Sequence, residues 1–218
     1  MIDPRPVVVV LDGYRCRQGE GSGPLARLGP DQRTVRNYWT GSGDSLSGRV
    51  DRLLKWNAAR SDVSAPVHLL ALSMGCQVAV RVGQDIGAVD EVVLVAPDPK
   101  ARPVKRDSQE VADGVVSAFE EAQTLWGGAA VPACPFTEAL ISLAKRARRL
   151  RVIYCRSDGV AEWDGNVDAL VAELAAVDGV ELIEAVEGRV VTASGVTVDL
   201  SDGGPGDVHQ RLWSAIHL

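Results

Sequence analysis

The stretch that decides the fold is Val67-His-Leu-Leu-Ala-Leu-Ser-Met-Gly-Cys-Gln-Val-Ala-Val-Arg-Val82. Its first six residues are apolar apart from one histidine, which is typical of a strand buried on both faces. A helical pattern begins directly after Ser73 and continues to about Gln84. A serine between a buried strand and a helix, with Gly75 two residues later, matches the context of the G-x-S-x-G motif.

A serine in so tight a turn is held in strained backbone geometry, and its hydroxyl is pushed clear of the sheet. We therefore predict that Ser73 is a nucleophile, and that the Met74 N–H and the helix dipole stabilise an oxyanion. The alternative is that Ser73 only caps the helix. Cys76 is a rival nucleophile, but one helical turn past the serine it is better interpreted as a small buried residue.

Strand and helix patterns alternate along most of the chain. Strands are expected at Val7–Leu11, Thr34–Thr40, Val67–Leu72, Glu91–Ala96, Arg151–Cys155 and Val180–Val186, with a hairpin at 189–200. Helices are expected at 45–59, 74–84, 108–126, 137–149, 166–177 and 207–216. The pattern predicts an α/β fold: a three-layer sandwich with a mainly parallel sheet of about six strands flanked by helices. We expect one domain over residues 1–218, with a helical lid insertion at about 100–149.

Composition excludes several classes of protein. Apolar residues make up 46% and charged residues 24% of the chain, which is ordinary for a globular domain. The net charge is −6, whereas a protein that binds nucleic acid normally has a basic face. The sequence has no run of about 18 apolar residues, so it predicts no membrane span. The start of the chain has no signal-peptide pattern, so a cytoplasmic location is expected. The four cysteines form no C-x-x-C pair, so we expect no metal site, and no cofactor is implied.

The segment around Ser73 resembles the "V-x-L-x-G-H-S-M-G-G" elbow of the α/β-hydrolase superfamily. Two positions depart from that pattern: Ala71 replaces the first glycine, and Cys76 stands where a second glycine is common. The resemblance spans Val7 to His209, although only the elbow is specific. It implies a serine hydrolase of the esterase or thioesterase class, with a triad in the chain order nucleophile, acid, histidine.

On this resemblance His209 is the base, because it alone of the three histidines follows the elbow and precedes a final helix. Asp158 is the preferred acid, since it follows the strand Arg151–Cys155 in a loop resembling the family's "strand-G-x-x-D". Asp98, which follows the previous strand, is the alternative acid, as in some thioesterases and cyclases. Asp164 is a further option.

The second oxyanion donor should lie in the loop after the first strand, where Gly13 or Tyr14 offers a backbone N–H. Asp12 in that loop is expected to hold the turn. Candidate walls of a substrate pocket under the lid are Trp126, Trp163 and Phe136, and the alternative is that they are ordinary core aromatics.

Three functions fit these residues. The first is an ester hydrolase acting on a small-molecule acyl substrate. The second is a thioesterase or acyl cyclase of a natural-product pathway, which would bind an acidic acyl carrier protein through basic residues at Lys145, Arg146, Arg148, Arg149 and Arg151. These cations could instead simply favour a helix C-terminus and solvent. The third is a non-catalytic ligand-binding protein on a hydrolase fold.

Overall fold

The computed structural model describes residues 5–13, 33–37, 44–87, 89–97, 120–127, 135–154, 166–186, 189–191 and 197–199. These ranges include all the strands of the central sheet. The structural statements below refer to this part of the chain.

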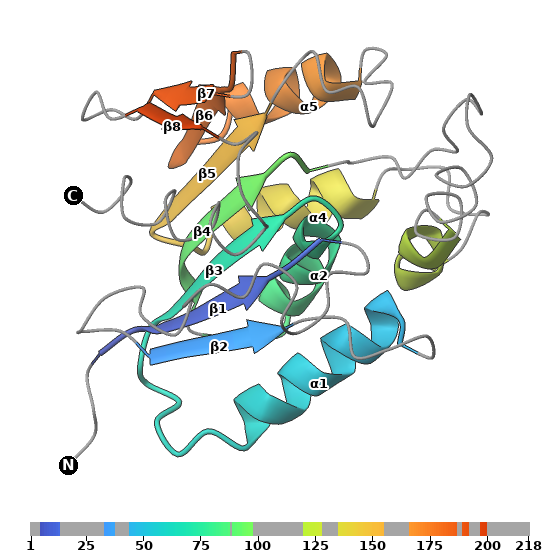
Figure 1. Cartoon of the computed structure of the whole chain (residues 1–218), viewed down its shortest axis with the longest axis vertical. Helices are drawn as coiled ribbons and strands as arrows, with labels where there is room; N and C mark the ends of the chain where they lie inside the picture. Colours follow the sequence, from blue (N-terminus) through green and yellow to red (C-terminus); the bar gives the residue numbers. More distant parts are fainter. Residues whose placement is uncertain are drawn as a thin grey trace.

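The centre of the molecule is a six-stranded sheet in the order β2-β1-β3-β4-β5-β6 (Figure 1). Each neighbouring pair is parallel, so the carboxyl ends of all the strands meet at one edge. The strands are β1 (Val7–Leu11), β2 (Arg33–Asn37), β3 (Val67–Leu72), β4 (Val89–Val95), β5 (Arg149–Tyr154) and β6 (Val180–Glu184). The central strands β1, β3 and β4 are almost wholly buried, as their apolar runs predict.

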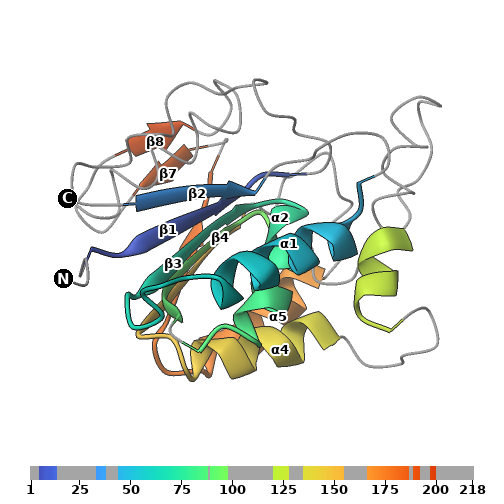
Figure 2. The same cartoon turned by 90° about the horizontal axis from the view of Figure 1, so that it is seen from below.

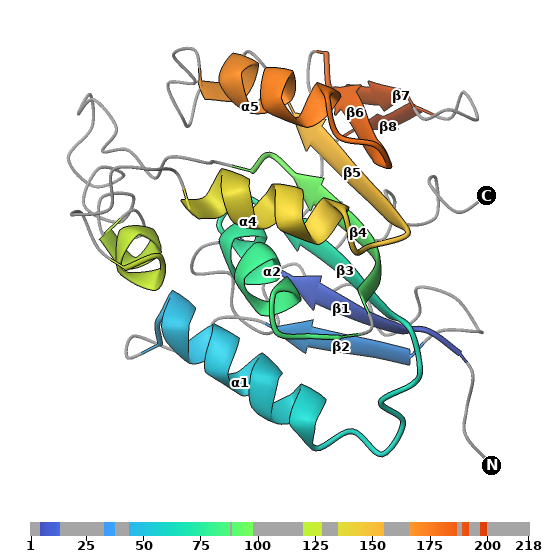
Figure 3. The same cartoon turned by 180° about the vertical axis from the view of Figure 1, so that it is seen from behind.

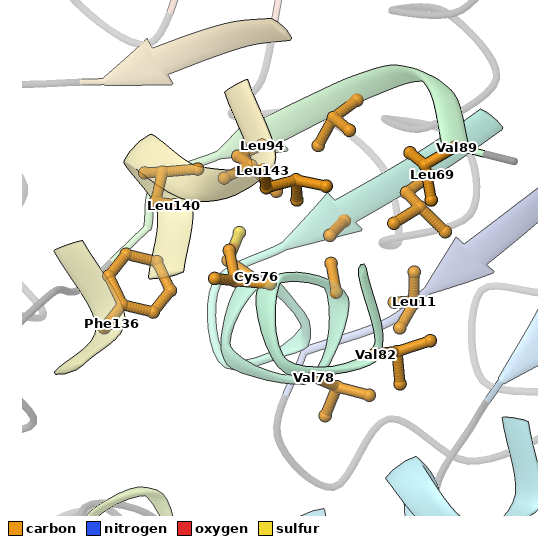
Figure 4. Close-up of a cluster of buried hydrophobic side chains, with 14 of the residues drawn as sticks. Leu11, Leu69, Cys76, Val78, Val82, Val89, Leu94, Phe136, Leu140 and Leu143 are labelled. Carbon is orange, nitrogen blue, oxygen red and sulfur yellow. The ribbon is translucent and has the colours of Figure 1, made fainter. Parts of the chain in front are cut away.

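Four helices cover one face of this sheet: α1 (Leu46–Ala58), α2 (Gly75–Gly83), α4 (Pro135–Ala144) and α5 (Asn166–Ala175). Figure 3 views the molecule from this helical side, where α2 lies between α1 and α4. Side chains from all four helices join alternate residues of the strands in one large core. Figure 4 shows the part of it around α2, where Leu11 and Leu69 project from the sheet towards the helix.

The opposite face carries a smaller core, because successive strand residues point to opposite sides. Val8 and Val10 of β1 belong to it, together with Leu70 of β3. Val190 and Val198 reach this core from β7 (Arg189–Val191) and β8 (Thr197–Asp199), an antiparallel pair on that side of the sheet (Figure 2). The predicted helix at 207–216 lies outside the described residues.

The predicted α/β class, the parallel sheet and the strand number are confirmed. The helix predicted at 137–149 is wrong at its end: α4 stops at Ala144, and β5 begins at Arg149, two residues earlier than expected. The reason is tertiary, because Arg148 binds Asp90 of the adjacent strand and Arg146 donates to the Gly83 carbonyl. These partners favour a turn and a strand over continued helix.

The predicted lid insertion at 100–149 also needs correction. Within it, α4 belongs to the sandwich, since Phe136, Leu140 and Leu143 lie in the main core (Figure 4). Residues 120–125 form a short helix beside the start of α1, on the side of the carboxyl ends of the strands (Figure 1). Within the ranges described, no helix combines the length and apolar character needed to cross a membrane.

Candidate active site

The serine predicted as nucleophile occupies a turn of unusual backbone geometry. Ser73 follows β3 directly, has a φ of 52°, and is exposed although its neighbours on both sides are largely buried. A positive φ brings Cβ too close to the following carbonyl oxygen, which costs about 1–2 kcal/mol. The Ser73 N–H compensates by donating to the Val95 carbonyl oxygen of β4 at 2.8 Å. The hydroxyl-bearing side chain is thus displayed at the carboxyl edge of the sheet.

The glycine of the motif is needed for close packing. A Cβ at Gly75 would overlap the Leu11 carbonyl oxygen and lie 2.8 Å from the Asp12 carbonyl oxygen. Gly75 therefore lets the first turn of α2 rest directly on the end of β1. Ala71, at the position of the motif's first glycine, is fully buried in β3, where a small side chain fits.

The N-terminal end of helix α2 lies at the turn that contains Ser73. Met74 is the N-cap of α2, and the N–H of Cys76 donates to the Ser73 carbonyl oxygen at 2.8 Å. The first N–H groups of a helix lack partners within the helix, and the helix dipole adds partial positive charge there. The Met74 N–H thus belongs to an electropositive backbone end beside Ser73, which suits an oxyanion donor.

The rival nucleophile is in the core. Cys76 is fully buried in α2, and its Sγ lies 3.4 Å from the Val95 carbonyl oxygen (Figure 4). Burial raises the pKa of the Cys76 thiol far above its ordinary value, which suppresses the reactive thiolate. Cys76 is therefore a packing residue, as its place in the helix predicted.

The end of β1 carries an interaction that the sequence analysis missed. Arg49 of α1 is fully buried, and its Nη2 donates to the Asp12 carbonyl oxygen at 2.8 Å. Asp12 is itself fully buried and immediately precedes Gly13, one of the predicted oxyanion donors. The signal was present in the sequence, because Arg49 falls between Leu46 and Val50 on the apolar face of its helix.

The fold and this turn can be compared with known proteins. No protein-family model and no curated protein matches the sequence. Solved structures do match: the esterase Est1E from Butyrivibrio proteoclasticus, determined with ferulic acid, has a TM-score of 0.54 and 13% identity, covering 84% of this chain and 80% of its own. The chain has the α/β-hydrolase fold.

Two further solved structures are similar to the same extent. One comes from a study of the metagenome-derived lipolytic enzymes LipS and LipT, with a TM-score of 0.53, 16% identity and 85% of each chain covered. An esterase from Pyrococcus furiosus has a TM-score of 0.53 and 17% identity, covering 84% of this chain and 72% of its own. At such low identities the likeness establishes the α/β-hydrolase fold alone.

Among the predicted pocket residues, two come together on the α/β-hydrolase core. Trp126 and Phe136 pack edge to face, with ring centroids 6.2 Å apart. The Trp126 indole N–H donates to the side-chain oxygen of the buried Gln77 at 2.6 Å, so this segment is fastened to α2. Phe136 is almost fully buried in the main core, and only Trp126 of this pair is partly exposed.

The basic residues proposed to bind a carrier protein lie elsewhere. Arg148 and Arg149 are at the amino end of β5, whereas Ser73 follows the carboxyl end of β3. Arg148 binds Asp90 and Glu91, and the buried Arg151 donates to Glu181. Much of this positive charge is therefore already neutralised within the protein. His68 also lies at that edge, with its Nε2 3.1 Å from Asp90.

Several predicted site residues lie outside the described part of the chain: Tyr14, Asp98, Asp158, Trp163, Asp164 and His209. Their roles remain predictions. The structure therefore describes the nucleophile position and the Met74 and Gly13 backbone around it.

Proposed function

We propose that this chain is a serine hydrolase that cleaves a small-molecule carboxylic ester or thioester through an acyl-enzyme at Ser73. The observation that carries the proposal is the exposed Ser73 in a left-handed turn between a buried strand and a helix N-terminus. Strain of this kind is concentrated at functional sites, because it is retained only where surrounding structure enforces it. Structures of the same fold are named as esterases and lipolytic enzymes, which favours this reaction class.

In the first step, His209 takes the proton of the Ser73 hydroxyl as its Oγ attacks the acyl carbonyl carbon. The negative charge that develops on the carbonyl oxygen is stabilised by the N–H of Met74 and that of Gly13 or Tyr14. Collapse of this intermediate breaks the bond to the alcohol or thiol, which leaves with the proton from His209. Asp158, or alternatively Asp98, orients the imidazole and stabilises its cation.

In the second step, water attacks the acyl carbon of the Ser73 ester and gives its proton to His209. The acid is released, and Ser73 recovers its proton. The short helix at 120–125 stands at the carboxyl side of the sheet, where ligands of open α/β sheets bind. Trp126 directly follows this helix, is partly exposed, and donates to Gln77 near the start of α2. We infer that this segment contributes to binding the acyl group.

A fluorophosphonate probe tests the nucleophile. We expect labelling of the wild-type protein at Ser73 and loss of labelling in Ser73→Ala. Ser64→Ala is the matched control, because Ser64 is also exposed but lies in the turn before β3, at the other end of the strand. Unchanged labelling of Ser73→Ala would overturn the assignment, and no labelling of folded wild-type protein would favour the ligand-binding alternative.

Substrate class is tested separately by comparing p-nitrophenyl esters with acyl thioesters of the same chain length. A higher kcat/KM for the thioesters would favour the thioesterase reading over the esterase reading. The acid is tested by comparing Asp158→Ala with Asp98→Ala, and a larger loss of kcat in Asp98→Ala would reverse the present ranking.

A further inference from the structure

A fully buried arginine contacts the backbone from which the second oxyanion donor is predicted to come. Arg49 lies on the apolar face of α1, and its Nη2 donates to the Asp12 carbonyl oxygen at 2.8 Å. Resting on the hydrolase function proposed above, we propose that Arg49 is a positioning residue that fixes the Asp12–Gly13 peptide and so organises the oxyanion hole.

Arg49 places a charged group on an otherwise apolar face. Moving a guanidinium out of water costs several kcal/mol, so a buried arginine needs hydrogen-bond partners at its tip. Leu46, Val50 and Leu53, on the same face of α1, are all core residues. The Arg49 guanidinium reaches the end of β1, where Asp12 is also fully buried and its carbonyl oxygen accepts the hydrogen bond.

Because of the geometry of the peptide bond, the hydrogen bond from Arg49 also fixes the direction of a backbone N–H group. The Asp12 carbonyl and the Gly13 N–H belong to one peptide unit, and in a trans peptide they point in opposite directions. By holding the carbonyl oxygen, Arg49 directs the Gly13 N–H away from α1.

The same carbonyl oxygen adjoins the elbow. It would lie 2.8 Å from a Cβ at Gly75, so it is seated against the first turn of α2, two residues after Ser73. The Arg49 guanidinium, the end of β1 and the elbow therefore meet at a single backbone oxygen. A displacement of this oxygen would alter the spacing between the two predicted oxyanion donors.

The helix that presents Arg49 is anchored at its start. The Ser45 hydroxyl accepts a hydrogen bond from the Gly48 N–H at 3.0 Å, and the Glu121 carboxylate accepts one from the Leu46 N–H at 2.8 Å. Asp44 receives two hydrogen bonds from Arg52, each 2.8 Å long. These contacts hold the start of the helix that carries Arg49 and join it to the short helix at 120–125.

The test compares Arg49→Met and Arg49→Lys with Arg60→Met. Arg60 is a matched control because its side chain is also largely buried and its Nη2 also donates to backbone carbonyl oxygens. Those oxygens belong to Asp62 and Ala65, which precede β3 at the end of the strand opposite Ser73. For each variant, kcat and KM for p-nitrophenyl butyrate, the rate of fluorophosphonate labelling of Ser73 and the thermal midpoint are measured.

We expect Arg49→Met to lower kcat by about 10- to 100-fold with KM within about twofold, because misplacing a donor weakens binding of the transition state more than of the substrate. Labelling of Ser73 should slow in parallel, since attack on phosphorus develops charge on the same oxygen position. Arg49→Lys should recover part of the rate. Arg60→Met should keep the wild-type kcat even where its thermal midpoint falls.

Three results would overturn the inference: a kcat of Arg49→Met within about twofold of wild type, an equal loss of kcat in Arg60→Met, or loss of cooperative unfolding in both Arg49 variants while Arg60→Met folds. The last would make Arg49 purely structural. Failure of the hydrolase proposal has a different signature, because wild-type protein would then show no hydrolysis that depends on Ser73.

Discussion

The backbone N–H of Ser73 and the carbonyl oxygen of Val95 form a 2.8 Å hydrogen bond that ties the end of β3 to the end of β4. One strand further along, the N–H of Ala96 donates to the Ile153 carbonyl oxygen at 2.8 Å, and Ala96 also has a positive φ, of 48°. At the ends of β3 and β4, therefore, a residue with positive φ donates its N–H to the next strand. These hydrogen bonds stabilise the two strained turns at the carboxyl edge of the sheet.

The strain at Ser73 predicts a stability difference between two inactive variants. Ser73→Gly should be more stable than Ser73→Ala by about 0.5–1 kcal/mol, because glycine adopts a positive φ freely and this outweighs its greater loss of chain entropy. Urea unfolding monitored by circular dichroism measures the difference. Ala96→Gly should gain stability for the same reason while keeping Ser73 reactive. A Ser73→Gly protein less stable than Ser73→Ala would show that the turn stores no strain.

The close approach at Gly75 predicts that Gly75→Ala is severely destabilising. Its new Cβ would meet backbone atoms of Leu11 and Asp12, which cannot move aside as a flexible side chain could. We expect a loss of about 2–4 kcal/mol in the free energy of unfolding, together with slower labelling of Ser73. Gly87→Ala is the matched control, because its Cβ would meet nothing within 4 Å. Equal stabilities of the two variants would contradict the packing described here.

Burial of Cys76 predicts that its thiol takes no part in catalysis. Cys76→Ala should keep kcat within about twofold and lower the free energy of unfolding by about 1 kcal/mol, since a small cavity is left in the core. In the native protein, peptide mapping should find Cys76 unmodified by iodoacetamide at pH 8, because burial raises the pKa of its thiol. Rapid alkylation of Cys76, or loss of activity in the alanine variant, would restore it as a candidate nucleophile.

The ion pairs at the amino edge of the sheet predict a pH-dependent contribution to stability. The hydrogen bonds from Arg148 hold the pKa of Asp90 below its ordinary value. Asp90 therefore stabilises the fold above its unfolded pKa of about 3.9, and this contribution disappears as the pH falls through the lower folded value. Arg148→Met should lose about 0.5–1 kcal/mol at pH 7, and the difference from wild type should shrink below about pH 4.

Urea unfolding of wild-type and Arg148→Met protein between pH 7 and pH 3 measures this difference. Arg81→Met is the control, since Arg81 forms an exposed pair with Asp85 within one helix at 2.6 Å and should contribute about 0.3–0.5 kcal/mol. A difference for Arg148→Met that grows as the pH falls would mean that Asp90 is not the linked group.

The sequence by itself determined the α/β class, the parallel sheet and the position of the elbow. Those features depend on local patterns: apolar runs of strand length, helical spacing after Ser73, and a glycine two residues later. Local sequence also indicated that Cys76 is a small buried residue, because it lies inside the helix, one turn past the elbow.

Only the tertiary structure decided which distant groups meet. The end of α4 depends on Arg148 reaching Asp90, and the role of Gly75 depends on how closely α2 approaches Leu11. The contact between Arg49 and Asp12 joins residues 37 positions apart in the chain. Sequence periodicity indicates which face of a helix or strand is apolar. It does not indicate which carbonyl oxygen a buried guanidinium binds, because that depends on how the helices are positioned against the sheet.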